Sequence, residues 1–499
     1  MTAKTTTLFF SMFFFIVLKG FSADQPDFRS VDSLTFRYYN EQKWDSVIHV
    51  GKQALRQNID YYYLRVRMGI SYFQKQSYFT AVTHLEKARK FNSGDPFVND
   101  FLYRAYLYTQ REEEARVLKS SLPKPEAGVP GAGQETGNSF LHSAHFESGY
   151  TLSSNANPKN LATLMGTDSL YGEQDLYGNN FYTSLGVTMW LSKRINITLA
   201  YNYLKFNKTK YIRYGRLEDH FLGTADSSWG TMYLWSFPYM SYDTSFSYHV
   251  NQHEGHFGLS WSLPKGFKIL PAFHLLAVNY PITSVKLDTV TVADPYFYMD
   301  YDSTLVSFPF TRKSYSSSQR DTSFMNYVIA LGITKEIGIF NIGIYGSWSN
   351  LNGRKQKQAG VSLTYYPMGN LNFYGTTTFT GFFEKKGGRL LISQVLGAKI
   401  THWLWIEGNF YYGDFTNANI FNGSVVYNNS DKIDYRGGAS LVFPVGRHLQ
   451  FSILYQYFRK ESKQIYYVHN PDNTINKTPQ IVYNPYNTNT IIGGITWKF

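Results

Sequence analysis

Ser143, His145 and Glu147 lie within five residues of one another, in the stretch SAHFESGY. Their residue types match the nucleophile, base and acid that acyl transfer requires. Residues two apart on an extended strand are separated by about 7 Å, so His145 cannot reach Ser143 unless a neighbouring strand helps. We therefore expect no catalytic site here and no enzymatic activity.

A second group of chemically capable side chains is His249, His253 and His256. Three imidazoles could hold a metal ion, but His256 faces away from the other two along a regular strand. The chain has no cysteine, which excludes disulfides, a lipoprotein acyl site and thiolate metal or redox chemistry. No phosphate-binding loop or paired-carboxylate motif is present. We expect no metal site and no cofactor.

The composition indicates what kind of element carries these residues. Aromatic residues make up 18% of the chain and charged residues 17%, yet after the N-terminus no apolar run is long enough for a membrane helix. Aromatic-rich strands of a transmembrane β-barrel would produce this composition. At the N-terminus, Lys4 precedes the apolar run LFFSMFFFIVL, which predicts a signal peptide at residues 1–23.

Residues 140–499 alternate between apolar and polar side chains in segments that are joined by turns and loops in regular order. Short turns are expected at 192–194, 264–266, 336–338, 367–370, 401–402 and 444–447. Long loops are expected at 153–179, 208–243, 283–321, 350–356, 384–389, 413–431 and 461–485. This order predicts a transmembrane antiparallel β-barrel of about 14 strands, with the short turns on the side of both termini.

The last strand of this barrel is the C-terminal segment GGITWKF. Ile495, Trp497 and Phe499 lie on one face of an extended chain, and smaller or polar residues lie on the other. Gly494, Trp497 and Phe499 resemble the C-terminal signal that the barrel assembly machinery recognises in outer-membrane proteins. The resemblance implies that this machinery is a partner during biogenesis.

The lumen of a 14-stranded barrel is intermediate between a filled interior and an aqueous channel, so we expect a narrow or loop-plugged pore. Tyr345, Tyr366, Tyr374, Trp403 and Trp405 are candidates to point inward, either to stack on sugars or to pack within the loops. The inward set derived from the alternation is small and polar: Ser184, Gly186, Asn196, Thr198, Asn202, Gly343, Ser347, Gly360, Ser362, Thr376, Thr378 and Ser440.

Residues 27–122 repeat at a spacing of 34. The repeating packing positions are Tyr38, Val47, Ala54, Gly69, Tyr72, Ala81, Ala88, Tyr106 and Ala115. This spacing resembles the tetratricopeptide (TPR) repeat, which implies an α-helical solenoid with a concave surface that binds a protein segment. A generic bundle of helical hairpins is the alternative. Residues 123–139 read as a linker, because the stretch from 120 to 139 is rich in proline and glycine, and we expect few contacts across it.

The formal net charge of +12 does not indicate nucleic-acid binding, because the basic residues cluster in the long loops. Arg354, Lys355 and Lys357 form one cluster, and Lys385, Lys386 and Arg389 form another. In the predicted topology both lie at the outer rim, where lipopolysaccharide phosphates are available. A solvated loop surface is the alternative reading.

The fold class is therefore α + β and multidomain, with a TPR solenoid before a transmembrane barrel. This domain order resembles exopolysaccharide-secretion porins and YaiO-like barrels, in the loop-rich style of Bacteroidota. The resemblance implies transport or export of a glycan or protein across the outer membrane, with the TPR domain in the periplasm and bound to a periplasmic protein. The alternative is a barrel that does not transport and serves as a scaffold subunit of a secretion or assembly complex.

Overall fold

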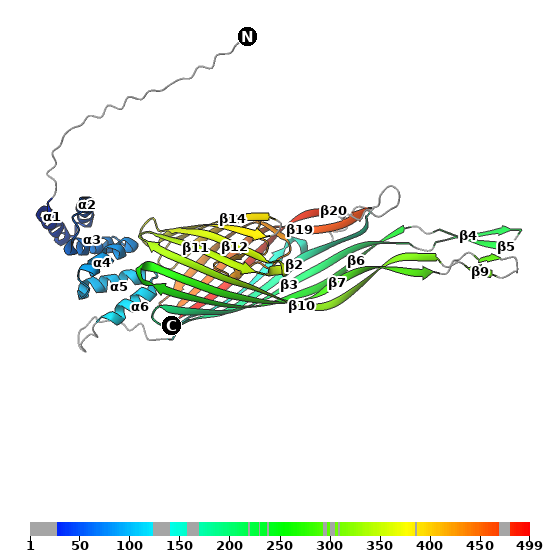
Figure 1. Cartoon of the computed structure of the whole chain (residues 1–499), viewed down its shortest axis with the longest axis horizontal. Coiled ribbons are helices and arrows are strands. Elements are labelled where there is room, and N and C mark those ends of the chain that lie inside the picture. Colours follow the sequence, from blue (N-terminus) through cyan, green and yellow to red (C-terminus); the bar gives the residue numbers. More distant parts are fainter. Residues whose placement is uncertain are drawn as a thin grey trace, which may run out of the picture.

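The computed structural model describes residues 27–122, 140–156, 169–217, 220–228, 230–236, 239–292, 297–299, 305–307, 310–384, 387–468 and 480–499. Within these residues, six α-helices precede a closed barrel of 14 antiparallel strands (Figure 1). The expected signal peptide at 1–23 and the expected linker at 123–139 lie outside the described residues.

The six helices are short and similar in length. They are α1 (Phe28–Asn40), α2 (Trp44–Arg56), α3 (Tyr62–Gln74), α4 (Tyr78–Phe91), α5 (Pro96–Tyr108) and α6 (Glu112–Ser121). Helix α1 begins at an N-cap, Asp27, whose carboxylate accepts from the Ser30 N–H at 2.7 Å. Helix α5 begins with the same chemistry at Asp95, followed by a proline at its first position.

The helices repeat every 34 residues in both position and backbone conformation. The first helices of the three pairs begin at 28, 62 and 96, and the second helices begin at 44, 78 and 112. The turn within each pair contains a glutamine with a left-handed backbone, at Gln42, Gln76 and Gln110, with φ of 54°, 58° and 56°. Three equivalent turns in one conformation show that the sequence period is also a structural period.

Most of the predicted packing positions lie in the helical core. Val47, Ala54, Ala81 and Ala88 are fully inaccessible to solvent, Ala115 is 1% exposed and Tyr106 8% exposed, while Tyr38 and Tyr72 are half-buried. Gly69 lies where α3 meets α4, and a Cβ at this position would come within 2.7 Å of the Leu85 side chain. Small residues at these points allow the two helices of a pair to approach closely.

The barrel strands follow one another around the ring in chain order, and β20 closes on β1 with Ile495 opposite Phe146. The fourteen strands are β1 (Leu141–Ser153), β2 (Ser169–Trp190), β3 (Ile195–Leu217), β6 (Tyr239–Leu263), β7 (Phe267–Val292), β10 (Phe310–Ile337), β11 (Phe340–Ser349), β12 (Gln356–Tyr365), β13 (Phe373–Glu384), β14 (Gly387–Lys399), β15 (Trp405–Tyr412), β18 (Lys432–Val445), β19 (Leu449–Val468) and β20 (Gln480–Lys498). Three small hairpins lie in the loops: β4 (His220–Ser227) with β5 (Gly230–Ser236), β8 (Phe297–Met299) with β9 (Leu305–Ser307), and β16 (Asn419–Ile420) with β17 (Val425–Val426).

The predicted strand count and the six predicted short turns agree with the structure. All six turns lie at the end of the barrel that faces the helices, which we call the short-turn rim (Figure 1). The long loops differ from the prediction, because much of 208–243 and 283–321 continues the strands as antiparallel ribbons, β3 with β6 and β7 with β10.

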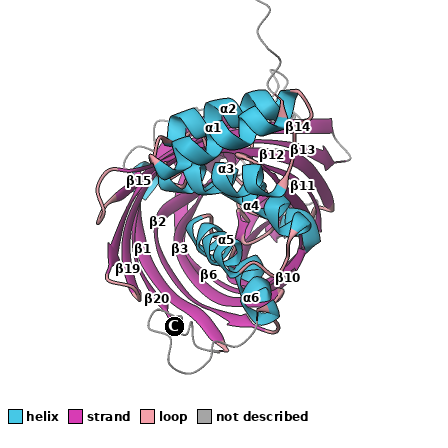
Figure 2. Ribbon diagram, turned by 90° about the vertical axis from the view of Figure 1, so that its left-hand side faces the viewer, coloured by secondary structure: helices cyan, strands magenta, loops and turns pink. Residues whose placement is uncertain are grey.

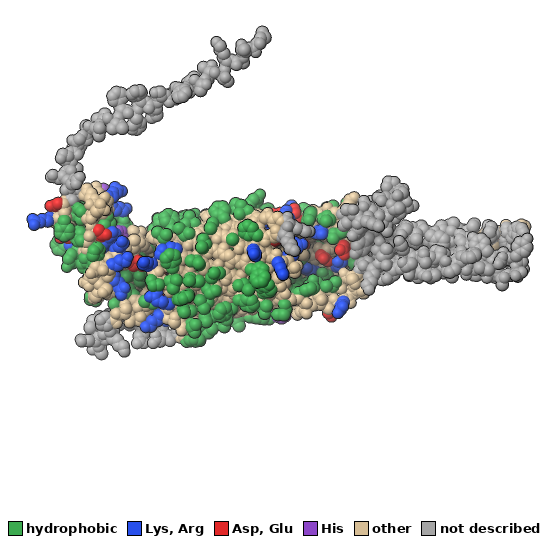
Figure 3. All heavy atoms as spheres, in the orientation of Figure 1, with side chains coloured by type: hydrophobic (Ala, Val, Ile, Leu, Met, Phe, Trp, Pro, Cys, Tyr) green, Lys and Arg blue, Asp and Glu red, His purple; other side chains and the backbone are tan. Residues whose placement is uncertain are grey.

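The outside of the barrel carries a broad apolar surface (Figure 3). On β20 the outward residues Ile491, Ile495 and Trp497 are exposed, whereas Gly494 is buried against Ser452 and Glu147, as the alternation predicts. Among the described residues, none of the helices has the length and apolar character needed to cross a bilayer.

The helical domain (27–122) is anchored on the short-turn rim, and Figure 2 shows its helices lying across that end of the barrel. Phe79 of α4 stacks on Tyr366 at a centroid distance of 4.0 Å, and its N–H donates to the Gly369 carbonyl at 2.9 Å. The Asn370 amide donates to the Gln76 carbonyl at 3.0 Å.

The N-terminal end of α6 forms the second anchor, through ion pairs. Arg111 lies 3.0 Å from the Glu336 carboxylate, and Lys268 lies 3.1 Å from Glu113. Arg116 covers the Trp190 ring at 4.1 Å. The expectation of few contacts between the two parts is therefore wrong, because long-range contacts connect them even though the intervening segment is rich in proline and glycine.

Candidate functional site: the barrel lumen

The segment from 413 to 431, which we call the lumen loop, joins β15 to β18 and crosses the inside of the barrel. Counted from β1, β7 is the fifth strand of the ring, and β15 and β18 are the eleventh and twelfth, so β7 forms the opposite wall. At the tip of the loop, the Gly423 carbonyl accepts from His274 Nδ1 at 2.9 Å, and the Asn422 amide donates to the Leu270 carbonyl. Both wall residues belong to β7, so the loop spans the lumen.

The base of the lumen loop is held by apolar packing. Phe415 and Ala418 are fully inaccessible to solvent, and they pack in one cluster with Phe382, Tyr411 and Phe458 of the wall. Burying a large apolar side chain contributes about 1.5–3 kcal/mol. This apolar packing therefore fixes the base of the loop inside the barrel.

Arg389 holds the same base through polar contacts. Its guanidinium donates to the carbonyls of Asp414 and Thr416, both at 3.0 Å, and it pairs with the carboxylates of Asp414 at 3.2 Å and Glu384 at 2.6 Å. Gln356 supplies a further acceptor at 3.2 Å. Arg389 is thus committed to the lumen loop and is not available at the outer rim, where the sequence analysis had placed it.

The tip of the lumen loop is held by a network of hydrogen bonds. A carbonyl only accepts, so His274 Nδ1 donates to the Gly423 carbonyl. The other ring nitrogen of His274, Nε2, lies 3.2 Å from a Glu254 oxygen. Asn202 and Gln252 donate to the Glu254 carboxylate at 2.9 and 2.5 Å, so the network connects the tip of the loop to β3, β6 and β7.

The backbone at the tip of the lumen loop is strained. Phe421, Asn422 and Gly423 have φ of 50°, 54° and 82°, a run of left-handed backbone that costs about 1–2 kcal/mol at each non-glycine residue.

A cavity of about 890 Å³ lies beside the lumen loop. Its wall is formed mainly by β1, β2, β3, β6 and β7 and by β15 and β18–β20, and residues 421 and 424–430 of the loop complete it. Amide, hydroxyl and phenol groups predominate among its polar lining residues, with Tyr177, Tyr182, Tyr248, Tyr280, Tyr411 and Tyr427 among them. The charged groups that line it have both signs: Glu147, Asp175, Glu254, Glu407, Lys208, Arg436 and Lys460.

The end of the barrel opposite the helices is narrowed by an additional strand pairing. Beyond the last β1–β2 pair at Asn180, the free edge of β2 pairs with β19 from Gln174 to Ser169. From Gln464 to Tyr466, β19 pairs with β20 along one edge and with β2 along the other, beyond its last pair with β18 at Glu461. The buried Gln174 amide donates to Ser462 at 2.8 Å and fixes this pairing.

The residues first considered for chemistry lie on different faces of the barrel wall. His145 and Glu147 line the cavity, but the described contacts include no hydrogen bond between Ser143 and His145. His249 and His253 bond to Asn207 and Tyr201 on the outer face, whereas His256 lies inside, as the alternation predicts. Among the described residues, no group of three histidine or acidic side chains could hold a metal ion.

The remaining predicted residues divide by position. Arg354, Lys355 and Lys357 are exposed, and Lys385 and Lys386 lie outside the described residues. Trp403, a candidate for the lumen, is instead exposed at a short turn and stacks on Phe443. Sequence reasoning placed segment 413–431 outside the barrel. Its apolar residues Phe415 and Ile420 were the available signal that it folds inward.

No family model and no curated protein sequence matches the chain. A structure of a Pseudomonas aeruginosa FadL homologue is similar at 8% identity and a TM-score of 0.41, covering 72% of this chain and 90% of that one. The Pseudomonas putida toluene transporter TodX is similar at 7% identity and a TM-score of 0.36, with the same shares. Omp33 of Acinetobacter baumannii is similar at 8% identity and a TM-score of 0.29, covering 72% of this chain and all of that one.

Proposed function

We propose that the protein is a gated transport channel of the bacterial outer membrane, with the lumen loop as its gate. The 14 strands form a closed ring, and its outer face is apolar, as a bilayer requires. In this placement the short-turn rim faces the periplasm and the long ribbons face outward. The helical domain is then periplasmic.

The observation that carries this proposal is the way in which the lumen is filled. A barrel that serves only as a scaffold can close its interior with side chains from the strands. Here a separate segment crosses the lumen, with strained backbone at its tip, next to a cavity of about 890 Å³. Such a segment can move out of the lumen without breaking the backbone hydrogen bonds between the strands of the wall.

The lining of the cavity supports a polar cargo such as a glycan. Phenol rings offer flat faces on which sugar rings can stack, and amide and hydroxyl groups can exchange hydrogen bonds with sugar hydroxyls. Charged groups of both signs line the same space, so the lining does not select cations or anions strongly.

We further propose that the helical domain is a TPR solenoid that binds a periplasmic protein. Support comes from the 34-residue period of the helix starts and from the three equivalent glutamine turns. Contact between lipopolysaccharide phosphates and Arg354, Lys355 and Lys357 remains part of the proposal, because these cations are exposed. Recognition of Gly494, Trp497 and Phe499 by the barrel assembly machinery remains a prediction.

A reversible lock of the lumen loop tests the gate. A Cβ on Gly423 would lie 3.2 Å from the Ala330 Cβ, close to disulfide geometry, and the chain has no other cysteine. In planar bilayers, we expect Gly423→Cys/Ala330→Cys to be silent when oxidised and to conduct intermittently after reduction. The single cysteine variants control for strain at Gly423, and they should not respond to reductant.

A second variant weakens the base of the loop instead of locking its tip. Arg389→Gln removes two ion pairs, and we expect a higher open fraction than in the wild type. Lys357→Gln, an exposed charge change on a wall strand, is the matched control and should conduct as the wild type does. If Arg389→Gln and the reduced double cysteine variant both stay silent in folded barrels, the scaffold alternative is favoured.

A further inference from the structure

Strands β6 and β7 separate part of the way along the barrel and leave a fork. Their last pair is Asn251 with Asn279, after which β6 pairs only with β3 and β7 only with β10. Pro281 lies two residues beyond that pair. It has no N–H to donate, and proline is tolerated in sheets where a strand becomes an edge. The sequence therefore places the fork at this position.

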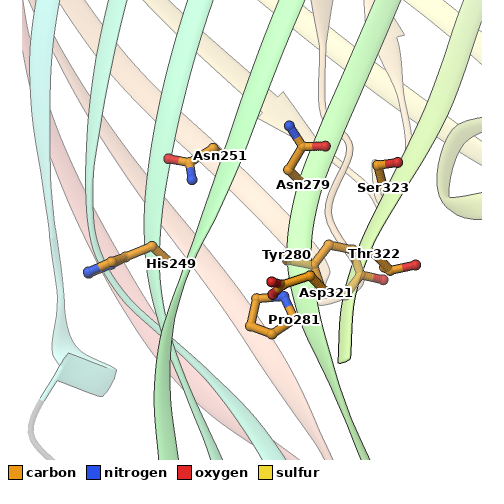
Figure 4. Close-up of a pocket in the computed structure, with 8 residues that line it drawn as sticks. All are labelled: His249, Asn251, Asn279, Tyr280, Pro281, Asp321, Thr322 and Ser323. Carbon is orange, nitrogen blue, oxygen red and sulfur yellow. The ribbon is translucent and has the colours of Figure 1, made fainter. Parts of the chain in front are cut away.

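A groove of about 460 Å³ lies on the barrel at this fork (Figure 4). His249 and Asn251 reach it from β6, Asn279 from β7, and Asp321 and Ser323 from β10. Tyr280 lines both this groove and the cavity beside the lumen loop. Tyr280 thus lies at the boundary between the groove and the lumen.

The groove lies directly above the apolar outer surface. Below Asn279 on β7 the next outward residues are Ala277 and Leu275, and Met325 is the next outward residue after Ser323 on β10. Leu275 is 37% exposed and Met325 65% exposed. With the bilayer around this apolar surface, the groove lies at the level of the lipid headgroups.

The chemistry of the groove fits hydroxyl groups better than phosphate. Two amides, an imidazole, hydroxyls and a carboxylate meet there, and no lysine or arginine is among the described residues that line it. The Asp321 carboxylate accepts hydrogen bonds from hydroxyls and repels phosphate. A sugar hydroxyl both donates and accepts, so it can satisfy the amides and the carboxylate together.

We propose that the groove at the β6–β7 fork binds a saccharide at the headgroup level of the outer leaflet. This inference rests on the membrane placement in the proposed function, but not on the gate. The saccharide could be the headgroup of a glycolipid or a free oligosaccharide. Binding through uncharged groups should change little with salt, unlike binding of phosphates at Arg354, Lys355 and Lys357.

The test uses the full chain in detergent, with two probes. One is rough lipopolysaccharide, and the other is the soluble core oligosaccharide released from it by mild acid. We expect Asn251→Leu/Asn279→Leu to bind lipopolysaccharide at least tenfold more weakly in titrations at high salt. Ser284→Leu/Ser318→Leu, which replaces an exposed hydrogen-bonded pair farther out on β7 and β10, is the matched control and should bind normally.

Asp321→Asn preserves the shape of the groove and keeps the test informative if the double leucine variant misfolds. We expect it to weaken saccharide binding several-fold and to make the residual binding less selective against phosphate.

If the free oligosaccharide competes with lipopolysaccharide at similar concentrations, the groove binds the sugar itself. If it does not compete, the groove requires the lipid-anchored form. The proposal is overturned if the wild-type protein binds neither probe at high salt. It is also overturned if the control variant loses as much affinity as the groove variants. Conductance is measured in a separate experiment, so the binding result can be interpreted even if the barrel does not conduct.

Discussion

His84 illustrates how much a single buried residue can contribute to the helical domain. It is 8% exposed, its ring stacks on Tyr72, and its Nδ1 lies 3.1 Å from the Arg65 guanidinium. Arginine can only donate, so Nδ1 accepts and the ring is neutral. Burial, together with the nearby Arg65 charge, lowers the pKa of His84 to about 4.

The helical domain should therefore lose stability as the solution becomes acidic. The pKa of His84 is about 6.5 in the unfolded chain and lower in the folded one, so the unfolded state takes up the proton first. Stability is complete above pH 6.5 and falls toward pH 4, by about 2 kcal/mol between pH 7.5 and 5. Urea unfolding followed by circular dichroism at 222 nm measures it. His84→Gln should flatten this dependence, and an unchanged slope would contradict the assignment.

At the scale of elements, the strands could be predicted and the path of the lumen loop could not. Alternation fixes which side chains share a face, so the turns and the 14 strands follow from local sequence. The position of segment 413–431 depends on contacts with β7 and with Arg389, which no local pattern reveals. The apolar residues Phe415 and Ile420 signal that the segment is buried, but they do not indicate which wall of the barrel it contacts.

Ile491 and Ile492 test which face of β20 points outward and which points into the lumen. Ile491 is 62% exposed and lies opposite Tyr150 and Tyr455 on the outer face, whereas Ile492 lines the cavity. A lysine that faces lipid costs about 2–4 kcal/mol at mid-bilayer, and one that faces an aqueous lumen costs little. Ile491→Lys should reduce the folded fraction on heat-modifiability gels far more than Ile492→Lys. Equal losses would contradict the outward assignment.

At the scale of the whole molecule, the helical domain and the barrel act as one clamped unit. Contacts on the short-turn rim extend from Trp190 at the end of β2 to Gly369 in the turn before β13, which is about half of the ring. The sequence predicted few contacts between the helical domain and the barrel because the segment between them is rich in proline and glycine. That composition describes the linker alone and carries no information about the two surfaces that it joins.

The ion pairs of Arg111 provide a test of whether the helical domain is held on the barrel. Arg111 lies within 3.1 Å of three carboxylates, those of Glu86, Glu114 and Glu336. Arg111→Ala leaves all three without their shared partner, at a cost of about 3–5 kcal/mol for a buried pair, whereas Glu336→Gln leaves Arg111 still paired.

The readout is hydrogen exchange at the Phe79 amide, which lies in the first turn of α4 and donates to Gly369 of the barrel. Its protection therefore reports docking, and we expect Arg111→Ala to speed its exchange about 100-fold or more, by the rule that 1.4 kcal/mol is a factor of ten. Ala81 is the internal control, because its N–H donates to Ser77 within the same helix end. If Ala81 accelerates equally, the change unfolds α4 locally. If neither amide responds, the ion pairs do not hold the domain on the barrel.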